Sequence, residues 1–119
     1  MYADEIGSVM LRGTVGSLVQ RLAAVHAARG TDGVFDVVDD LRVHLPLADR
    51  RADDDLRGAA LQRLIADTRI PSNHIDVEVS DGWVTLMGRV RAASESAHAV
   101  QDIASLRGVV GITNRIEVA

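Results

Sequence analysis

A repeated pattern of glycine and branched aliphatic residues constrains the fold of this 119-residue chain more than any other feature. When the sequence is compared with itself at an offset of 75 positions, residues 7–43 match residues 82–118 without a gap at ten positions. Residue frequencies alone would give roughly two or three matches in such a window. The pattern therefore predicts a duplicated α/β unit, with glycine at turns and bends and with branched residues on pleated surfaces. The recurring glycines are Gly7, Gly13, Gly33, Gly82, Gly88 and Gly108, and the other matched pairs are Val9/Val84, Leu11/Leu86, Val15/Val90, Ala24/Ala99, Val25/Val100, Val34/Val109 and Val43/Val118.

The second copy, residues 53–119, contains every element of the unit. Its first helix is expected to be N-capped within the acidic run Asp53–Asp55 and to be stopped by Pro71. Two strands of alternating polarity follow, joined by a hairpin turn at Asp81-Gly82. A second helix and a last strand give the order helix, strand, strand, helix, strand. The apolar face of the first helix is predicted at i, i+4 and i+8 spacing, on Leu56, Ala60 and Leu64.

The second helix of this copy is predicted from its end signals and its apolar face. Ser94 is the expected N-cap, and Gly108 is expected to close the helix. The residues expected to face the core are Ala97, Val100, Ile103 and Ala104.

The first copy, residues 1–45, contains only the later part of the unit. A strand near 7–15, a helix near 17–30 and a strand near 34–45 are expected, whereas a leading helix and strand are missing. Residues 46–52 form the expected linker. The predicted fold class is α+β, with a partial βαβ repeat before a complete αββαβ repeat and with helices packed on a small mixed sheet.

Three segments resemble the BON domain family. They are I-x-V-x-V at 75–79, D-G-W-V-T-L-M-G-R-V at 81–90 and G-V-V-G-I-T-N-R-I-E-V at 108–118. Residues 7–15 and 33–43 repeat the last two in the first copy. The resemblance implies tandem αββαβ units without catalytic activity, in a family of osmotic-shock, secretion and envelope proteins for which phospholipid attachment is commonly proposed.

Composition excludes several function classes. Cysteine is absent, which excludes disulfides, thiolate metal sites and cysteine nucleophiles. The net charge of −4 argues against nucleic-acid binding, which needs a basic surface. No segment approaches the roughly 18 apolar residues of a membrane span, and residues 1–25 lack signal-peptide features. We expect a cytoplasmic protein, or a periplasmic or exported one if an N-terminal signal has been removed.

Catalytic and metal motifs are also missing from the sequence. None of the four histidines is placed four residues from another His or Cys, as zinc ligands on a helix would be, and Asp53–Asp55 lacks the glycine and terminal Glu of a calcium loop. No phosphate-binding or nucleophile-elbow motif occurs. We therefore predict a protein that is not an enzyme, with no catalytic residues, no metal and no cofactor. The histidines are His26, His44, His74 and His98.

Strand alternation predicts a candidate interaction face. If Val84 and Leu86 face the helices, Trp83 and Met87 point to the opposite face of the sheet. Met10 and Arg12 hold the equivalent positions in the first copy. Such an apolar face indicates packing of the copies, cover by a second chain, or insertion of Trp83 at a lipid interface. In the lipid alternative, the arginines that could bind headgroup phosphates are Arg89 and Arg91.

The incomplete first copy predicts an uncovered apolar surface and an open sheet edge, which proteins normally protect. A binding module that associates with a protein partner, including a second copy as a homo-oligomer, is the leading hypothesis. Attachment to a phospholipid surface, possibly in an envelope or osmotic-stress role, is the alternative. Sensing of a small ion or small ligand is third, although the sequence contains no evident cluster of oxygen ligands.

Overall fold

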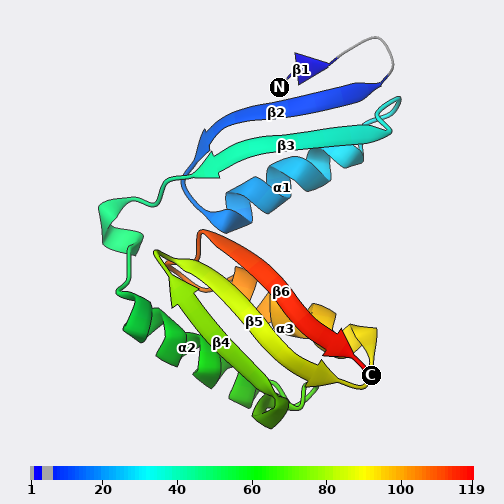
Figure 1. Ribbon diagram of the computed structural model, residues 1–119. Coiled ribbons are helices and arrows are strands. Elements are labelled where there is room, and N and C mark those ends of the chain that lie inside the picture. The colour runs from blue at the N-terminus through cyan, green and yellow to red at the C-terminus, as the bar shows by residue number, and fades with distance from the viewer. Residues whose placement is uncertain (1, 4–6) are drawn as a thin grey trace. The chain divides into compact units, whose positions relative to one another are not determined.

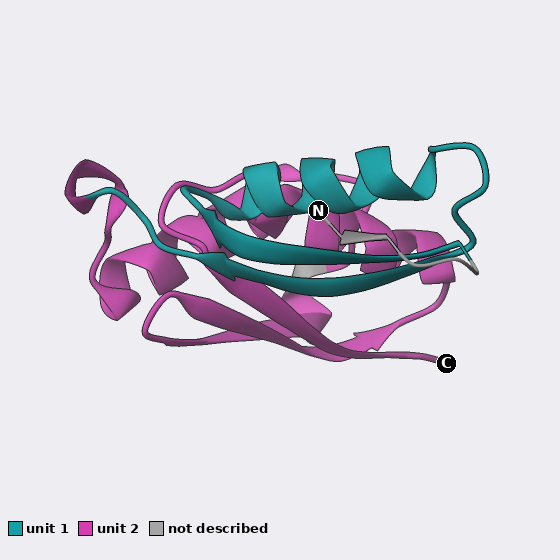
Figure 2. Cartoon of the chain, turned by 90° about the horizontal axis from the view of Figure 1, so that it is seen from above, with its two compact units in different colours: residues 1–46 teal, residues 47–119 magenta. Residues whose placement is uncertain are grey.

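The computed structural model describes residues 2–3 and 7–119, which form two three-stranded sheets with helices (Figure 1). The chain divides into two units, shown in separate colours in Figure 2: unit 1 is Met1–Pro46 and unit 2 is Leu47–Ala119. Each sheet lies within one unit. The mixture of helices with small mixed sheets confirms the predicted α+β class.

Unit 2 has the complete order of elements. Its central strand β5 (Trp83–Val90) pairs antiparallel with β4 (Ile75–Ser80) and parallel with β6 (Gly111–Val118). The helices are α2 (Asp53–Ala66) and α3 (Ala93–Ala104), and two short 3-10 helices are η1 (Leu47–Asp49) and η2 (Ser72–His74). The core joins both helices to the sheet through the buried side chains of Leu56, Ala60, Leu64, Val77, Val84, Leu86, Ala99 and Ile103.

The β4–β5 hairpin forms as its sequence predicts. Asp81 and Gly82 both have positive φ, 50° and 81°, which matches the right-handed twist of the two strands that they join. The alternation of apolar and acidic residues buries Val77 while it leaves Asp76 and Glu78 exposed.

Unit 1 contains a shorter version of this arrangement. Strand β2 (Ser8–Val15) pairs in parallel with β3 (Asp36–Val43), and α1 (Leu18–Arg29) connects them. The expectation that the leading strand is missing is wrong in part, because β1 (Tyr2–Ala3) pairs antiparallel with the start of β2. Val9, Leu11, Val25 and Ala28 are buried in its core, with Ala24, Val34, Val37 and Leu41 packed against them.

The two units repeat the same loop hydrogen bonds at the 75-residue offset. In each unit, one bond extends the parallel ladder just before its first pair and another extends it at its far end. The backbone N–H donors and carbonyl acceptors are Phe35 to Gly7 and Val110 to Gly82 (N–O 3.2 and 3.0 Å), and His44 to Val15 and Ala119 to Val90 (2.8 and 2.9 Å).

A polar contact between helix and strand is also repeated, although its residues differ. In unit 1 the Arg21 Nε donates to Asp39 Oδ2 at 2.9 Å. The equivalent positions in unit 2 are Ser96 and Asn114, where the Asn114 amide donates to the Ser96 hydroxyl at 2.8 Å. The two units therefore repeat these hydrogen bonds as well as the order strand, helix, strand.

Two expectations about helix starts are wrong. Ser94 lies inside α3, whose N-cap is Ala92, because the Glu95 carboxylate reaches back to accept from the backbone N–H groups of Arg91 and Ala92 at 2.9 and 3.0 Å. Ala97, expected to face the core, is exposed, and Ala99 is buried instead. The N-cap of α2 is Ala52, and the acidic run occupies the first turn.

The helix ends and the linker also differ in detail from expectation. Helix α2 ends at Ala66, before Pro71, and α3 ends at Ala104, before Gly108. Residues 46–52 include η1. Among the described residues, none of the helices has both the length and the hydropathy needed to cross a bilayer.

Candidate interaction surfaces

Trp83 lies on the outer face of the unit 2 sheet, where it is 42% exposed. Its indole Nε1 donates to the Thr113 hydroxyl at 2.7 Å. Its ring covers Gly111, its partner on β6, because a Cβ built on Gly111 would overlap the ring. The indole is therefore fixed against the sheet by a neighbouring strand and does not project freely.

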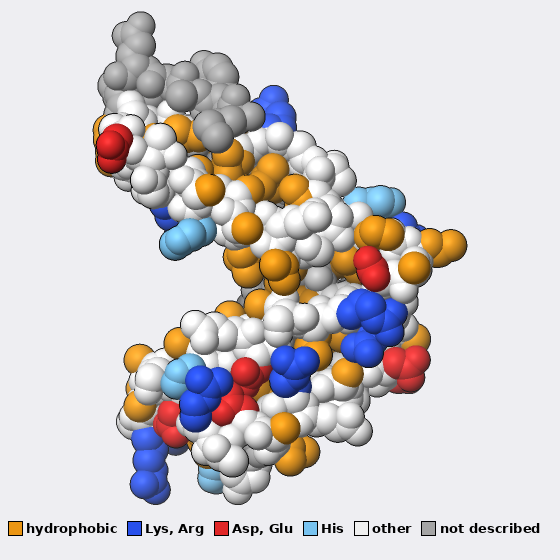
Figure 3. All heavy atoms as spheres, turned by 180° about the vertical axis from the view of Figure 1, so that it is seen from behind, with side chains coloured by type: hydrophobic (Ala, Val, Ile, Leu, Met, Phe, Trp, Pro, Cys, Tyr) orange, Lys and Arg blue, Asp and Glu red, His pale blue; other side chains and the backbone are white. Residues whose placement is uncertain are grey.

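The rest of this face is polar. Met87 pairs with Asp76 on one side and with Arg115 on the other. Arg89 donates to the Glu117 carboxylate at 3.2 Å. The opposite charges of Arg89 and Glu117, both exposed, thus partly neutralise each other. Trp83 and Met87 do not form a continuous apolar patch on this face. Figure 3, which views the chain from behind, shows the opposite side, where apolar, basic and acidic side chains are also interspersed.

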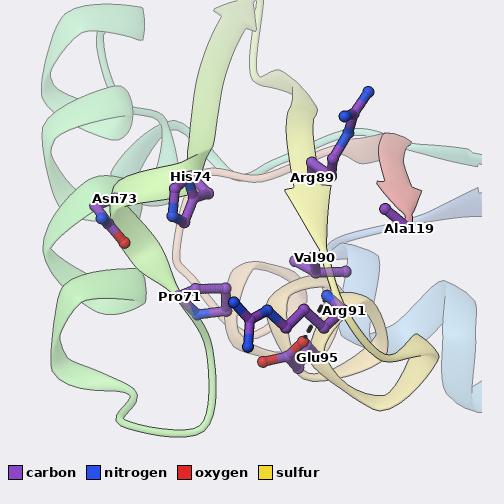
Figure 4. A pocket seen from close by; sticks show the side chains of 8 residues that line it. All are labelled: Pro71, Asn73, His74, Arg89, Val90, Arg91, Glu95 and Ala119. Atoms are coloured by element: carbon purple, nitrogen blue, oxygen red, sulfur yellow. Dashed lines mark hydrogen bonds between the residues drawn. The ribbon is translucent and has the colours of Figure 1, made fainter.

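An open pocket of about 570 Å³ lies at the end of β5, between the start of α3 and the end of β6 (Figure 4). The side chains of Arg89 and Arg91 point in different directions in this view, so they do not converge on one anion. The Glu95 carboxylate accepts the Arg91 N–H and already occupies the helix N-terminus. The lining residues are Pro71, Asn73, His74, Arg89, Val90, Arg91, Glu95 and Ala119.

Met10 and Arg12 lie on β2 in unit 1, at the positions expected from the repeat. An Arg12 guanidinium N–H donates to the Met10 sulfur at 3.5 Å, and the Arg12 Nε lies 3.4 Å from Asp40 Oδ2. The Arg12 side chain is 73% exposed. Met10 and Arg12 belong to the sheet of unit 1, whereas Trp83 and Met87 belong to the sheet of unit 2.

Gly13 and Gly88 show where the two sheets differ. Their φ angles are 135° and 136°, and all six recurring glycines have positive φ. At Gly88 a Cβ would overlap the carbonyl oxygen of His74, because the chain entering β4 passes there. At Gly13 no atom of the described residues lies within 4 Å of the same position.

Within the described residues, the side of β2 away from β3 is paired only near its start. Strand β1 pairs with Val9 and Met10, and among the described residues no strand pairs with the same side of β2 beyond Met10. The Val15 carbonyl accepts from the His44 N–H and therefore points toward β3. Because the backbone N–H and C=O groups of successive residues point to opposite sides of a strand, those of Arg12 and Thr14 point away from β3.

The outer edge of β4, by contrast, is blocked by side chains. The Arg57 Nε donates to the Val77 carbonyl at 2.8 Å, and the Val77 N–H donates to the Asp76 carboxylate at 2.8 Å. Arg57 and Asp76 are themselves 3.2 Å apart. The N–H and carbonyl of Val77, which could otherwise pair with another strand, are thus occupied.

The outer strands β3 and β6 carry a matching block at equivalent positions. The Leu41 N–H donates to Asp39 Oδ1, and the Ile116 N–H donates to Asn114 Oδ1, both at 3.0 Å. Sequence analysis missed these contacts, since a side chain that bonds to its own strand leaves no periodic signal.

Sequence analysis also missed a carboxyl pair at the ends of α2 and α3. The Arg69 guanidinium lies 2.8 Å from Asp67 and 3.7 Å from Asp102. Burial, followed by the hydrogen bond and charge of Asp67, raises the pKa of Asp102 to about 6. Hydrogen bonds from Arg69 and Asp102 hold the pKa of Asp67 well below its usual value. The pair therefore shares a proton under mildly acidic conditions.

The imidazole of His98 lies one helical turn before Asp102 on α3. Its Nδ1 and the Asp102 Oδ2 are buried without a hydrogen-bond partner. Within residues 2–3 and 7–119, no three His, Cys, Asp or Glu side chains gather closely enough to hold a metal ion.

Comparison with known proteins finds relatives that cover most of this chain. The chain is 32% identical over 113 residues to osmotically-inducible protein Y of Escherichia coli (strain K12), covering 92% of this chain and 56% of the relative, so it spans little more than half of that protein. Two solved structures of CdsD, a structural protein of the type III secretion system of Chlamydia trachomatis, have 15% and 16% identity and a TM-score of 0.49. Each aligns with 92% of this chain, and they are matched over 48% and 51% of their own lengths.

The family model for the BON domain matches this chain twice. The matched segments are residues 2–44 and 52–119, which together span nearly the whole sequence and fall in units 1 and 2. The chain therefore belongs to the BON domain family.

Proposed function

We propose that this chain is a non-catalytic BON-type module that binds a polypeptide partner, including a second copy of itself, through the open edge of β2. The observation that supports the proposal is that, among the described residues, no strand pairs with β2 beyond Met10 on the side away from β3, whereas β5 in the other unit pairs on both sides. An open edge offers main-chain hydrogen bonds to an added strand.

The contrast with the other edges supports a specific role for β2. Side chains block backbone groups on the outer edges of β3, β4 and β6. Such blocks prevent unselected pairing of strands. An edge that remains open in the same chain is then the place where a partner strand adds.

Sedimentation velocity at tens of micromolar tests this function. We expect the wild-type chain to sediment as a dimer or larger species and Thr14→Pro to sediment as a monomer, because proline removes an N–H that faces the open side. Far-UV circular dichroism identifies any variant that fails to fold, and Arg12→Ala, which keeps every backbone donor, is the matched control. A wild-type chain that remains strictly monomeric contradicts self-association.

Attachment to phospholipid is the competing function, and the half-exposed Trp83 is the observation that favours it. Its hydrogen bond to Thr113 and the net charge of −4 weigh against insertion into an anionic surface. Co-sedimentation with vesicles of phosphatidylcholine and phosphatidylglycerol, with the fluorescence of Trp83 as a second signal, separates the two. Pelleting with a blue shift would support lipid attachment, and its absence would remove that alternative.

The similarity to osmotically-inducible protein Y supports placing this module in a response to osmotic stress. We expect its abundance in cells to rise after an increase in external salt. Quantitative immunoblotting against an unrelated protein of constant abundance measures that change. An unchanged amount would oppose the stress role without affecting the binding role.

A further inference from the structure

A shallow hollow of about 350 Å³ lies on the outer face of the unit 2 sheet, between Trp83 and the edge strand β4. All of its lining residues belong to unit 2, and they come from α2, β4 and β5. The lining residues are Arg57, Glu78, Val79, Ser80, Trp83 and Thr85. The hollow therefore combines an aromatic ring, a carboxylate and two hydroxyl groups.

The polar groups of the hollow are free to bind a ligand. Within residues 2–3 and 7–119, the side chains of Glu78, Ser80 and Thr85 make no hydrogen bond or ion pair. The register of the hairpin places Ser80 opposite Trp83 and Glu78 opposite Thr85. The Glu78 carboxylate is thus the diagonal neighbour of the indole, which is within reach of one long side chain that contacts both.

The charge of the hollow is negative, although Arg57 lines it. The Arg57 Nε donates to the Val77 carbonyl at 2.8 Å, and its guanidinium lies 3.2 Å from Asp76 Oδ1. Asp76 therefore offsets the charge of Arg57. The exposed carboxylate of Glu78 remains uncompensated, so a cation is the complementary ligand.

Trp83 is held in an orientation that suits a cation. Its ring rests on Gly111 and its Nε1 donates to Thr113, while 42% of the residue stays exposed. A fixed ring loses little conformational freedom on binding, and its face attracts positive charge. The equivalent position in unit 1 is Ser8, so this feature belongs to unit 2 alone.

We propose that this hollow binds an arginine side chain of a basic polypeptide partner, stacked on Trp83 and donating to the oxygens of Glu78, Ser80 and Thr85. A guanidinium is planar and carries five N–H donors, which matches a flat ring beside several acceptors. The net charge of −4 favours the approach of a basic partner. The contact is on unit 2, so it stands independently of the function proposed for the β2 edge of unit 1.

Trp83 is the single tryptophan of the chain, so its fluorescence reports directly on the hollow. Hexa-arginine is the probe, titrated into the full chain at low salt, with hexa-lysine of equal charge and maltohexaose, a neutral saccharide, for comparison. We expect a saturable change in Trp83 emission with hexa-arginine and none with maltohexaose. Hexa-lysine should bind at least about threefold more weakly, because an ammonium group has no flat face to stack on the indole.

Two carboxylate variants test the site against general attraction of charge. Glu78→Gln should weaken binding of hexa-arginine about threefold, because it removes the unpaired charge beside the ring. Glu117→Gln is the matched control, since it removes the same charge from an exposed position of the same sheet, opposite Arg89 on β5. This control should leave the affinity nearly unchanged.

Trp83→Leu tests the ring itself and should weaken binding at least about fivefold. Because this variant lacks the reporter, binding is followed by the anisotropy of labelled hexa-arginine, and far-UV circular dichroism verifies the fold. Wild-type affinity in Trp83→Leu, identical losses for the two carboxylate variants, or equal affinities for the two peptides would overturn the proposal. A saturable response to maltohexaose without one to hexa-arginine would also overturn it and would assign the hollow to a saccharide.

Discussion

Asp67 and Asp102 compete for Arg69 at the ends of two helices, and their opposite pKa shifts make this contact sensitive to pH. The folded pKa of Asp102, about 6, lies above the ordinary value of 3.8. The folded state therefore holds this proton more tightly than the unfolded chain does. The stability that it contributes is complete below about pH 4 and is lost as pH rises to about 6. Asp67 has the opposite sign, because its lowered pKa contributes stability that is lost only in stronger acid.

Asp102→Asn is expected to remove the loss of stability between pH 4 and 6 that Asp102 causes. At pH 7 the variant should be more stable by about 1 kcal/mol, less than the full shift implies because solvent screens the pair. Urea unfolding at a series of pH values, followed by Trp83 fluorescence, measures the change. Glu78→Gln, an exposed carboxylate on β4, is the control. A pH profile that Asp102→Asn leaves unaltered would refute this assignment.

Gly111→Ala is expected to dislodge Trp83, because the added Cβ would overlap the indole ring. The loss of stability should be about 1–3 kcal/mol, as in other overpacked sites, with a red shift of the tryptophan emission. Gly58→Ala provides the control, since a Cβ on this helical glycine has nothing within 4 Å and should stabilise α2 slightly. Emission that stays at the wild-type wavelength would show that the ring does not rest on Gly111.

At the scale of elements, the strands could be predicted from sequence better than the helix ends. Alternation placed Val77, Val84 and Leu86 toward the core, and all three are fully buried. The start of α3 could not be found from Ser94, because Glu95 caps that helix from three residues inside it. Propensity identifies residues that can cap a helix, whereas the geometry of the preceding loop decides which of them does.

On the outer face of the unit 2 sheet, strand alternation likewise predicts the direction of a side chain but not its contacts. Parity predicts the outward direction of Trp83, and the structure places it on that face. Its anchor, Thr113, lies thirty residues away along the chain, and no local pattern indicates that contact. The short pairing of β1 with Val9 and Met10 could not be anticipated, because the repeat contains no sequence match for it.

The contact between α2 and the hairpin turn gives the element-scale prediction. Asp53→Ala removes a carboxylate that accepts two backbone N–H groups from the turn. Because bonds to charged groups contribute more than neutral ones, we expect a loss of about 1.5–3 kcal/mol from the free energy of unfolding. Asp54→Ala, in the same helical turn but exposed, should cost less than about 1 kcal/mol. Equal losses of stability for the two variants would mean that the hydrogen bonds from the turn to Asp53 add nothing to the favourable interaction of an acidic side chain with the helix N-terminus.

On the scale of the whole molecule, the two units differ in how much core each possesses. Among the residues whose burial the structure describes, the largest fully buried side chains all belong to unit 2: Leu56, Leu64, Leu86, Ile103, Val77, Val84, Val90 and Val109. Unit 1 has a smaller cluster around Val9 and Leu11, without a second helix in its described part. A smaller core offsets less conformational entropy, so unit 1 should open at a lower free energy than unit 2.

Self-association through β2 would stabilise unit 1 and not unit 2. The free energy of opening of unit 1 should therefore depend on the concentration of the chain. Hydrogen exchange of the β2 amides is expected to slow by about tenfold as the chain is raised from sub-micromolar to tens of micromolar concentration, while that of the β5 amides stays constant. Thr14→Pro should remove this dependence, since its effect falls on the open side of β2. If both strands slow equally, association involves the whole molecule instead, and if neither slows, the β2 edge is not where copies meet.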